Sequence, residues 1–459
     1  MVAFLEKVNH FVWGIPALIL ILGVGIYLSI RTGFAQITLF PKALRSFFGR
    51  LLHKTTNKDG VTSFQALCTA LAATVGTGNI VGVAGAIAIG GPGAIFWMWI
   101  CGIFGMVTKF AEAALAVRYQ ERNANGETVG GPMYMIRQGL PKRWHWMAVV
   151  YAFFGVVAAF GVGNATQVNA VIGSINSVVI SFGGQESLTG NLILGILLAV
   201  LITVLLLGGA KKIGVVAEQL VPFAAVLYII LGIGVLWARR NGIGEAFASI
   251  LAGAFSPRSV TGGMLGSAFT ALRVGASRGV FTNEAGMGTA SIAHGAASVS
   301  HPAEQGLMGI MEVFLDTIVI CTMTALVILT SGVHIPYGTD AGGTLTAMAF
   351  SSVYGEWILI PIAMAMCCFA VATVLGWGLY GARCAQYLFG EDVWKKFVMI
   401  QAVTVVIGAV MNTGTVWLLS ETVNGLMSVP NLITLAWLSP ELVKLTRQYK
   451  ENFPIRQNS

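Results

Sequence analysis

The chain has 459 residues, of which 56% are apolar and only 10% are charged, and its formal net charge is +8. Soluble globular proteins carry about 25% charged residues, so this chain has too few to cover a water-facing surface. The composition therefore excludes a soluble enzyme, a nucleic-acid-binding domain and a disordered scaffold. It indicates a protein whose solvent is lipid, because its basic residues lie in short loops between apolar runs.

The first apolar run, Phe11 to Ile30, lacks a basic leading segment and a small-residue cleavage site. We therefore interpret it as a retained helix rather than a signal peptide. The six cysteines lie within or at the edges of apolar segments and form no CxxC pair. This usage predicts neither a disulfide framework nor a zinc site.

A membrane-crossing helix needs about 20 predominantly apolar residues. Eleven segments meet this requirement, which predicts an all-α polytopic membrane protein with one transmembrane domain over 1–459 and a tail at 438–459. The predicted spans are 11–30, 62–90, 93–117, 144–181, 191–208, 213–237, 262–296, 306–331, 357–382, 393–411 and 414–437.

The distribution of lysine and arginine over alternate loops predicts the orientation of these spans. If the N-terminus is outside, the inside loops and tail hold 20 of the 27 basic residues, the outside loops hold 4 and the spans hold 3. Basic residues favour the cytoplasmic side, so we expect the N-terminus outside and the C-terminus in the cytoplasm. The longest outside loop, 334–356, contains an apolar part (Thr344 to Val353) that predicts a short helix and a candidate extracellular lid.

The second span, 62–90, is too long for one straight crossing. As a continuous helix its 29 residues would measure about 43 Å, against a hydrocarbon core of about 30 Å. Near its middle lies Gly76-Thr77-Gly78-Asn79, where two glycines weaken the helix by about 1 kcal/mol each relative to alanine. Unwound backbone at this depth is tolerated where it lines a cavity or is buried in protein.

A break of this kind can bind ions of both signs. The half-helix that begins near Gly78 directs free N–H groups and a positive dipole end into the cavity, which suits a carboxylate. The half-helix that ends near Val75 leaves carbonyl groups unpaired, which suits a small cation. The alternative is simple helix packing, since Gly78 and Gly82 form a GxxxG pair.

The span at 262–296 has the same character, because it is long, glycine-rich and carries Arg273, Arg278 and Glu284 within an apolar segment. Four spans separate it from span 62–90. The two therefore open two halves of five spans, 62–237 and 262–437, and an odd number of spans per half requires that the repeats be inverted. Paired interrupted spans at matching positions predict the binding site of a transporter.

Several motifs resemble the alanine/glycine:cation symporter family of bacteria and archaea. They are spread over most of the chain, and the string from Gly90 to Trp99 is the most specific of them. The motifs are TALAATVGTGNIVG (69–82), GGPGAIFWMW (90–99), GGPMY (130–134), RGVFTNEAG (278–286), FLDTI (314–318) and LGW (375–377).

This resemblance implies a sodium-coupled importer of small neutral amino acids in the cell (inner) membrane. It implies the leucine-transporter fold, a 5+5 inverted repeat, preceded by one extra N-terminal helix at 11–30. The implied partners are an amino acid such as alanine or glycine, Na⁺ and the lipid bilayer, with no cofactor and no nucleic acid. The sequence leaves open the amino acid carried, with glutamine as a larger alternative, and the oligomeric state.

The resemblance also implies roles for single residues. The carbonyl groups of Ala72 and Val75 and the hydroxyl of Thr373 would coordinate sodium. Ala372 stands where a second hydroxyl residue is expected, which leaves coupling to protons as an alternative.

The residues that the resemblance assigns to the substrate are Thr77, Gly78, Asn79, Gln167, Thr270, Gly275 and Trp377. The first three lie at the break that would hold the substrate carboxylate. Gln167 would face the substrate, and Trp377 would limit the size of the side-chain pocket. Backbone groups around Thr270 and Gly275 would receive the amine.

Carboxylates inside spans need a named partner, because they are rare and costly at this depth. Asp316 lies well inside span 306–331, with Glu312 one turn earlier. We expect a buried ion pair with Arg278 or Arg273 that holds span 262–296, while Arg273 has the alternative role of binding the substrate carboxylate. Glu112, Lys109 and His294 are interpreted as ordinary helix-end or loop residues.

Two other classes of function compete with a coupled symporter. A channel or uniporter would use the same glycine-rich breaks without coupling. A membrane enzyme would use Asp316, Glu284 and a histidine, but the chain shows no HExxH motif and no P-loop. Gly275-Ala-Ser-Arg-Gly279 fits GxSxG by letter alone, since it lies in an apolar helix and not after a strand. We therefore expect no enzyme.

Overall fold

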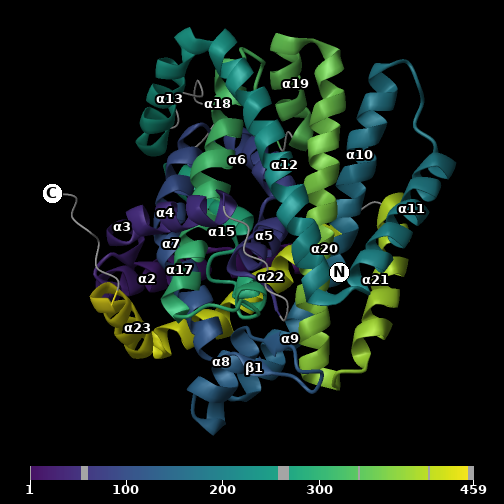
Figure 1. The fold of residues 1–459 in the computed structure, drawn as a ribbon. Coiled ribbons are helices and arrows are strands. Elements are labelled where there is room, and N and C mark those ends of the chain that lie inside the picture. Colours follow the sequence, from purple (N-terminus) through teal and green to yellow (C-terminus); the bar gives the residue numbers. More distant parts are fainter. Residues whose placement is uncertain (1, 53–59, 257–267, 340–341, 412–413, 453–459) are drawn as a thin grey trace.

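A computed structural model describes residues 2–52, 60–256, 268–339, 342–411 and 414–452. These residues are almost entirely helical, with one pair of two-residue antiparallel strands. Figure 1 shows a bundle in which segments far apart in the sequence lie side by side. The elements in chain order are α1 (Val2–Val12), α2 (Ile15–Thr32), α3 (Ala35–Thr38), α4 (Phe40–Leu52), α5 (Ser63–Thr74), α6 (Val81–Gly90), α7 (Gly93–Arg118), β1 (Glu121–Arg122), β2 (Thr128–Val129), α8 (Pro132–Gly139), α9 (Trp146–Phe160), α10 (Thr166–Ser181), α11 (Leu188–Leu206), α12 (Gly209–Ala238), α13 (Ile243–Phe255), α15 (Ala268–Asn283), α16 (Thr289–His294), α17 (Pro302–Val313), α18 (Thr322–Thr330), α19 (Gly342–Tyr354), α20 (Leu359–Phe389), α21 (Val393–Val410), α22 (Gly414–Trp437) and α23 (Ser439–Asn452).

Most predicted spans correspond to a single helix or to two helices joined by a π-helical segment. Among the described residues, seven helices are long and apolar enough to cross a membrane, or nine if each of two bent pairs is one span. Eleven spans are therefore not confirmed. One reason is that the predicted span 262–296 begins outside the described residues and is interrupted. Another is that the first predicted span contains only a short apolar helix, Pro16–Thr32.

The helix surfaces show why this bundle needs lipid. α11 exposes large apolar side chains along its length, among them Leu197, Val200 and Val204. α12 does the same with Phe223, Ile230 and other residues. Soluble monomers rarely expose contiguous apolar surfaces of this extent. By contrast, α7 is mostly buried and packs against α15 and α17, so it forms the centre of the bundle.

The first predicted interruption is present. α5 begins with a capping box, in which Thr62 and Gln65 exchange side-chain and backbone hydrogen bonds, and it ends at Thr74. A short 3₁₀ turn at Thr77–Asn79 follows, and α6 then leaves at an angle of 59° to α5. We call the segment from Val75 to Ile80 the first break.

The second interruption lies later in the chain than Thr270 and Gly275. α15 is continuous to Asn283, and left-handed backbone follows at Glu284 (φ 52°), Gly286 (φ 94°) and Gly288 (φ 81°). We call Glu284–Gly288 the second break. Gly275 lies within the continuous helix, where it allows α15 to pack closely against α7. A Cβ atom at this position would lie 2.2 Å from the Ala94 backbone oxygen on α7.

Two spans contain a π-helical segment that places functional side chains. Gly161–Ala165 joins α9 to α10, and Phe314–Cys321 joins α17 to α18. Such segments occur often at functional sites, since the extra residue shifts the side chains that follow. The first segment brings Gly163 so close to α20 that a Cβ atom would lie 2.3 Å from the Trp377 Cβ.

The loop predicted to contain a short helix does contain one, α19. It lies beside α6 and α18 (Figure 1). The Thr346 hydroxyl of α19 donates to the Ile80 carbonyl oxygen at 3.2 Å. α19 is therefore tied directly to the end of the first break.

The contact between α7 and α13 yields a stability prediction. A Cβ atom on Gly93 would lie 2.0 Å from the backbone carbon of Gly253, so Gly93→Ala is expected to lower the unfolding free energy by about 1–3 kcal/mol. Gly173 in α10 is the matched control, because a Cβ atom there would meet no other atom within 4 Å. Gly173→Ala should therefore be neutral or slightly stabilising. Thermal unfolding of the purified variants measures both, and equal melting temperatures would contradict the predicted contact.

Candidate functional site

A small cavity lies where the two breaks meet α10 and α20. Its polar lining comes from four separate parts of the chain, and we call it the central cavity. Its lining residues are Ala73, Thr74, Gly76, Thr77, Gly78, Val162, Gln167, Phe281, Glu284, Thr373 and Trp377. Five residues predicted for the site (Thr77, Gly78, Gln167, Thr373 and Trp377) thus lie around one space.

The first break supplies the cavity with backbone groups held in a fixed shape. Asn79 Oδ1 accepts a hydrogen bond from the Gly76 N–H at 2.9 Å, which closes the turn. The Thr77 hydroxyl donates to Gln167 Oε1 at 3.3 Å, and Gln167 Nε2 donates to the Val162 carbonyl in the π segment. The residues that lead into the N-terminal end of α6 therefore line the cavity beside a side chain that is itself oriented.

Thr373 reaches the first break from α20. Its hydroxyl donates to the Phe369 carbonyl one turn earlier at 2.9 Å, which leaves the oxygen free to act as an acceptor. A Cβ atom on Gly76 would lie 2.8 Å from this oxygen. Gly76 thus allows the Thr373 hydroxyl to approach the C-terminal end of α5. Ala72 and Val75 are buried at that end and are not among the lining residues.

The second break contributes a carboxylate that was not predicted for the site. Glu284 lines the central cavity and is buried. Its Oε1 accepts from the Trp377 indole N–H at 3.1 Å, and its Oε2 accepts from the Thr289 hydroxyl at 2.5 Å. The sequence signal that could have identified Glu284 as a site residue is a glutamate inside an apolar segment, beside a glycine-rich sequence.

Thr270 and Gly275, which were predicted to receive the substrate amine, lie away from the central cavity. Both residues belong to the continuous part of α15, and neither is among the residues that line the central cavity. The end of α15 reaches the cavity instead, through Phe281 and Glu284. The glycines of α15 serve its contact with α7, so glycine content alone did not locate the break.

Asn79 faces away from the cavity and connects the two breaks. Its Nδ2 donates to Asp316 Oδ1 at 2.5 Å. Asp316 Oδ2 accepts from the Thr317 hydroxyl, which in turn accepts from Asn283 Nδ2 at 3.1 Å. Asn283 Oδ1 then accepts from the Ala285 N–H, so an asparagine closes the backbone at each break. The π segment with Asp316 and Thr317 joins them.

The predicted ion pair of Glu312 or Asp316 with Arg273 or Arg278 is not found. Glu312 instead accepts from Lys109 Nζ at 2.8 Å and from His294 Nε2 at 2.9 Å. Arg278 lies 4.0 Å from Glu421 of α22, and Arg273 is half-buried on α15.

The packing of α7 against α17 explains why Glu312 pairs with Lys109 and not with an arginine. Lys109 and Glu312 face each other across the contact between α7 and α17, whose backbones approach so closely that a Cβ on Gly309 would lie 2.6 Å from the Lys109 oxygen. Lys109 and His294 are therefore parts of the buried core, although His294 ends α16.

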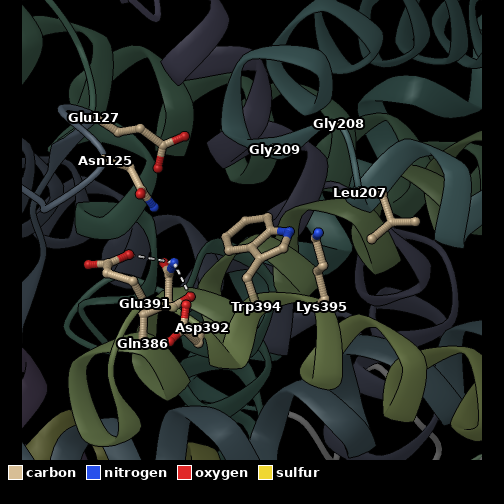
Figure 2. A pocket seen from close by; sticks show the side chains of 10 residues that line it. All are labelled: Asn125, Glu127, Leu207, Gly208, Gly209, Gln386, Glu391, Asp392, Trp394 and Lys395. Carbon is tan, nitrogen blue, oxygen red and sulfur yellow. Dashed lines mark hydrogen bonds between the residues drawn. The ribbon is translucent and has the colours of Figure 1, made fainter.

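A wider pocket lies away from the central cavity, between the β1–β2 turn, the α11–α12 connection and the start of α21. Figure 2 shows the carboxylates of Glu127, Glu391 and Asp392 on one side, with Trp394 and Lys395 opposite. The Arg383 guanidinium lies 2.9 Å from Glu127 and over the Trp394 ring. These contacts tie the turn to α20 and α21, and none of the predicted site residues lies there.

Solved structures share this fold. The crystal structure of MhsT in complex with L-phenylalanine aligns with a TM-score of 0.58 at 15% identity, over 85% of this chain and 99% of that one. A manganese transporter of Eremococcus coleocola aligns with a TM-score of 0.52 at 12% identity, over 87% of this chain and 79% of that one. These alignments show that the chain has the fold of the leucine-transporter type, with a cavity where its two helix breaks meet.

The family follows from the sequence as a whole. The model of the sodium:alanine symporter family matches residues 1–458, and the chain belongs to this family. The sodium/alanine symporter AgcS of Methanococcus maripaludis is 43% identical over 461 aligned positions, which cover 100% of this chain and 98% of the relative. A Bacillus subtilis relative named "Probable sodium/glutamine symporter GlnT" is 35% identical, over 96% of this chain and 89% of its own.

The buried ion pair yields a second stability prediction. Lys109→Met leaves the Glu312 carboxylate buried without its cation, and removal of one partner of such a pair costs about 3–5 kcal/mol. The double variant Lys109→Met/Glu312→Met removes both charges and should recover part of this loss. Thermal unfolding of the purified proteins measures both effects, and a single variant as stable as the wild type would contradict the pairing.

Proposed function

We propose that this protein is a sodium-coupled symporter that imports small neutral amino acids, such as alanine and glycine, across the cell (inner) membrane. The observation that carries the proposal is the central cavity itself. Its lining includes Thr77 and Gly78, which lead into the positive end of α6, and it also includes the Glu284 carboxylate just after α15. A zwitterion of a few carbon atoms matches a helix N-terminus and a carboxylate that line the same cavity.

The substrate carboxylate would bind at the N–H groups of Thr77 and Gly78. This assignment follows from the free donors at the start of a half-helix. Gln167 would contact the substrate beside them, while Asn79 holds the turn in shape. The substrate ammonium would lie at the second break, near Glu284, rather than at Thr270 and Gly275. Trp377, held by Glu284, would limit the size of the substrate side chain.

Sodium would bind at the C-terminal end of α5, to the carbonyl oxygens of Ala72 and Val75 and the hydroxyl of Thr373. Support comes from the position of Thr373 against Gly76 and from its free acceptor capacity. An ion there would stabilise the shape of the first break that presents Thr77 and Gly78. Sodium would then raise the affinity for the amino acid, and the amino acid would raise the affinity for sodium by the same factor.

Transport would follow from alternating access. The two inverted halves, 62–237 and 262–437, would move relative to each other around the central cavity. The N-terminus would lie outside and the C-terminus in the cytoplasm, because the basic residues concentrate on one side of the predicted spans.

Uptake into proteoliposomes tests the proposal. Labelled alanine should accumulate above its external concentration under an inward sodium gradient, since only coupled transport can do this. Equilibration without accumulation would indicate a uniporter, and accumulation driven by a pH gradient alone would indicate proton coupling. Competition by unlabelled glycine but not glutamine is expected; stronger competition by glutamine would indicate a larger substrate, as the name of the GlnT relative suggests for that protein.

The sodium site yields a third prediction. Thr373→Ala removes one proposed ligand and should raise the sodium concentration for half-maximal uptake about tenfold, which corresponds to 1.4 kcal/mol. Thr404→Ala is the matched control, because Thr404 makes the same hydrogen bond to its preceding turn, at 3.0 Å from the Ile400 oxygen, but is exposed on α21. Equal sodium dependence in the two variants would exclude Thr373 as a ligand.

A further inference from the structure

Glu112 is a fully buried carboxylate on α7 for which the proposed transport mechanism has no use. Its Oε1 accepts three hydrogen bonds: from the Gly286 N–H at 2.9 Å, from the Gly288 N–H at 3.0 Å and from Asn431 Nδ2 at 2.7 Å. Asn431 also donates to the Gly286 carbonyl oxygen. Glu112 therefore joins three elements of the bundle, namely α7, the second break and α22.

The second carboxylate oxygen of Glu112 has a different hydrogen-bonding environment. Glu112 Oε2 is buried and has no hydrogen-bond partner among the described residues, and the same is true of Asn431 Oδ1. A buried polar atom without a partner costs about 1–3 kcal/mol, and more when it is charged. Both atoms are acceptors, so they cannot bond to each other while Glu112 is ionised.

One proton on Glu112 gives both unpaired oxygen atoms a hydrogen-bond partner. A carboxylic acid and a primary amide form a pair of hydrogen bonds when they lie side by side. The amide N–H donates to the acid carbonyl oxygen, and the acid O–H donates to the amide oxygen. The structure shows the first of these bonds, Asn431 Nδ2 to Glu112 Oε1. A proton on Oε2 gives Asn431 Oδ1 its missing donor, while Oε1 keeps its three donors.

The surrounding charges also favour a protonated, neutral Glu112. The nearest cation, Lys109, lies one turn earlier on α7 and donates to Glu312. With Gln305 Nε2 as a donor to the His294 Nδ1 at 2.7 Å, the His294 ring directs only Nε2, at 2.9 Å from Glu312, toward the carboxylates. One cation thus faces the three carboxylates of Glu112, Glu284 and Glu312, and an uncompensated charge in the membrane interior is costly.

The other ionisable groups near Glu112 are hydroxyls. Tyr151 of α9 and Tyr380 of α20 are buried and interact electrostatically with Glu112. They cannot supply a positive charge. The titratable groups of this buried cluster include Lys109, Tyr151, Glu284, His294, Glu312, Asp316 and Tyr380.

We propose that Glu112 is a proton-binding site, with the proton on Oε2 and shared with Asn431 Oδ1. The proton comes from solvent, neutralises the carboxylate and attaches α22 to the second break. Loss of the proton leaves both acceptor oxygens without a donor and weakens this attachment. Because the second break lines the central cavity, the occupancy of the proton site biases the conformation of the transporter.

The test uses Glu112→Gln in the full-length protein. Glutamine presents a carbonyl oxygen and an NH₂ group, which is the hydrogen-bonding pattern of the protonated acid. We therefore expect this variant to fold and to bind the second break and Asn431 as the wild type does. An unfolded or strongly destabilised Glu112→Gln protein at neutral pH would overturn the proposal, because it would show that the negative charge is needed.

Two measurements follow the proton directly. The infrared spectrum of the wild type at neutral pH should contain the carbonyl band of a protonated carboxylic acid, and Glu112→Gln should lack the part of it due to Glu112. The melting temperature of the wild type should fall as pH rises above about 4.3, until folded Glu112 has lost its proton. An exposed glutamate ionises near pH 4.3, so the unfolded state binds fewer protons than the folded state and stability decreases with pH.

The pH dependence of the melting temperature should be smaller in Glu112→Gln. Glu304→Gln is the matched control, since Glu304 pairs with Arg50 in a partly exposed position on α17, and it should keep the wild-type pH dependence. An identical infrared band and an identical pH dependence in wild type and Glu112→Gln would overturn the proposal. Neither measurement requires transport, so the result is independent of the substrate and coupling ion proposed above.

Discussion

Peptide groups within a membrane must be paired inside the protein, because lipid offers no hydrogen bonds. This constraint explains why the described residues are almost entirely helical and why the first and second breaks are so thoroughly supported. At the first break, Asn79 replaces the missing backbone partner of Gly76. At the second, Asn283 and Glu112 accept the N–H groups of Ala285, Gly286 and Gly288.

The supports of the two breaks are also connected to each other. Asp316 and Thr317 lie in a π segment and bond to Asn79 and Asn283 respectively. A change of shape at one break therefore alters hydrogen bonds that reach the other. In a symporter, this connection would allow an ion at the first break to influence an ammonium group at the second. It gives the buried Asp316 a role different from the ion pair expected for it.

Glycine has two opposite uses in this fold, which limits how far its positions can be interpreted from sequence. Gly76 and Gly78 lie where the helix is interrupted, whereas Gly275 and Gly93 allow helix backbones to approach each other. In sequence both kinds occur in apolar segments of similar composition. Only the first kind lines a cavity. This is why the first break was predicted at the correct residues, whereas for the second the sequence indicated only the span that contains it.

The sequence by itself determined the features that depend on local composition. These are the lipid environment, the position of most helices, the break at Gly76–Asn79, the short helix before Tyr354 and the family, because each is encoded in a continuous stretch of residues. Only the tertiary structure decided which side chains meet. It paired Glu312 with Lys109 rather than with an arginine, placed Glu284 in the cavity and joined Glu112 to Asn431. Those contacts link residues up to 319 positions apart, and they depend on the rotation and depth of each helix, which the composition of a single helix does not specify.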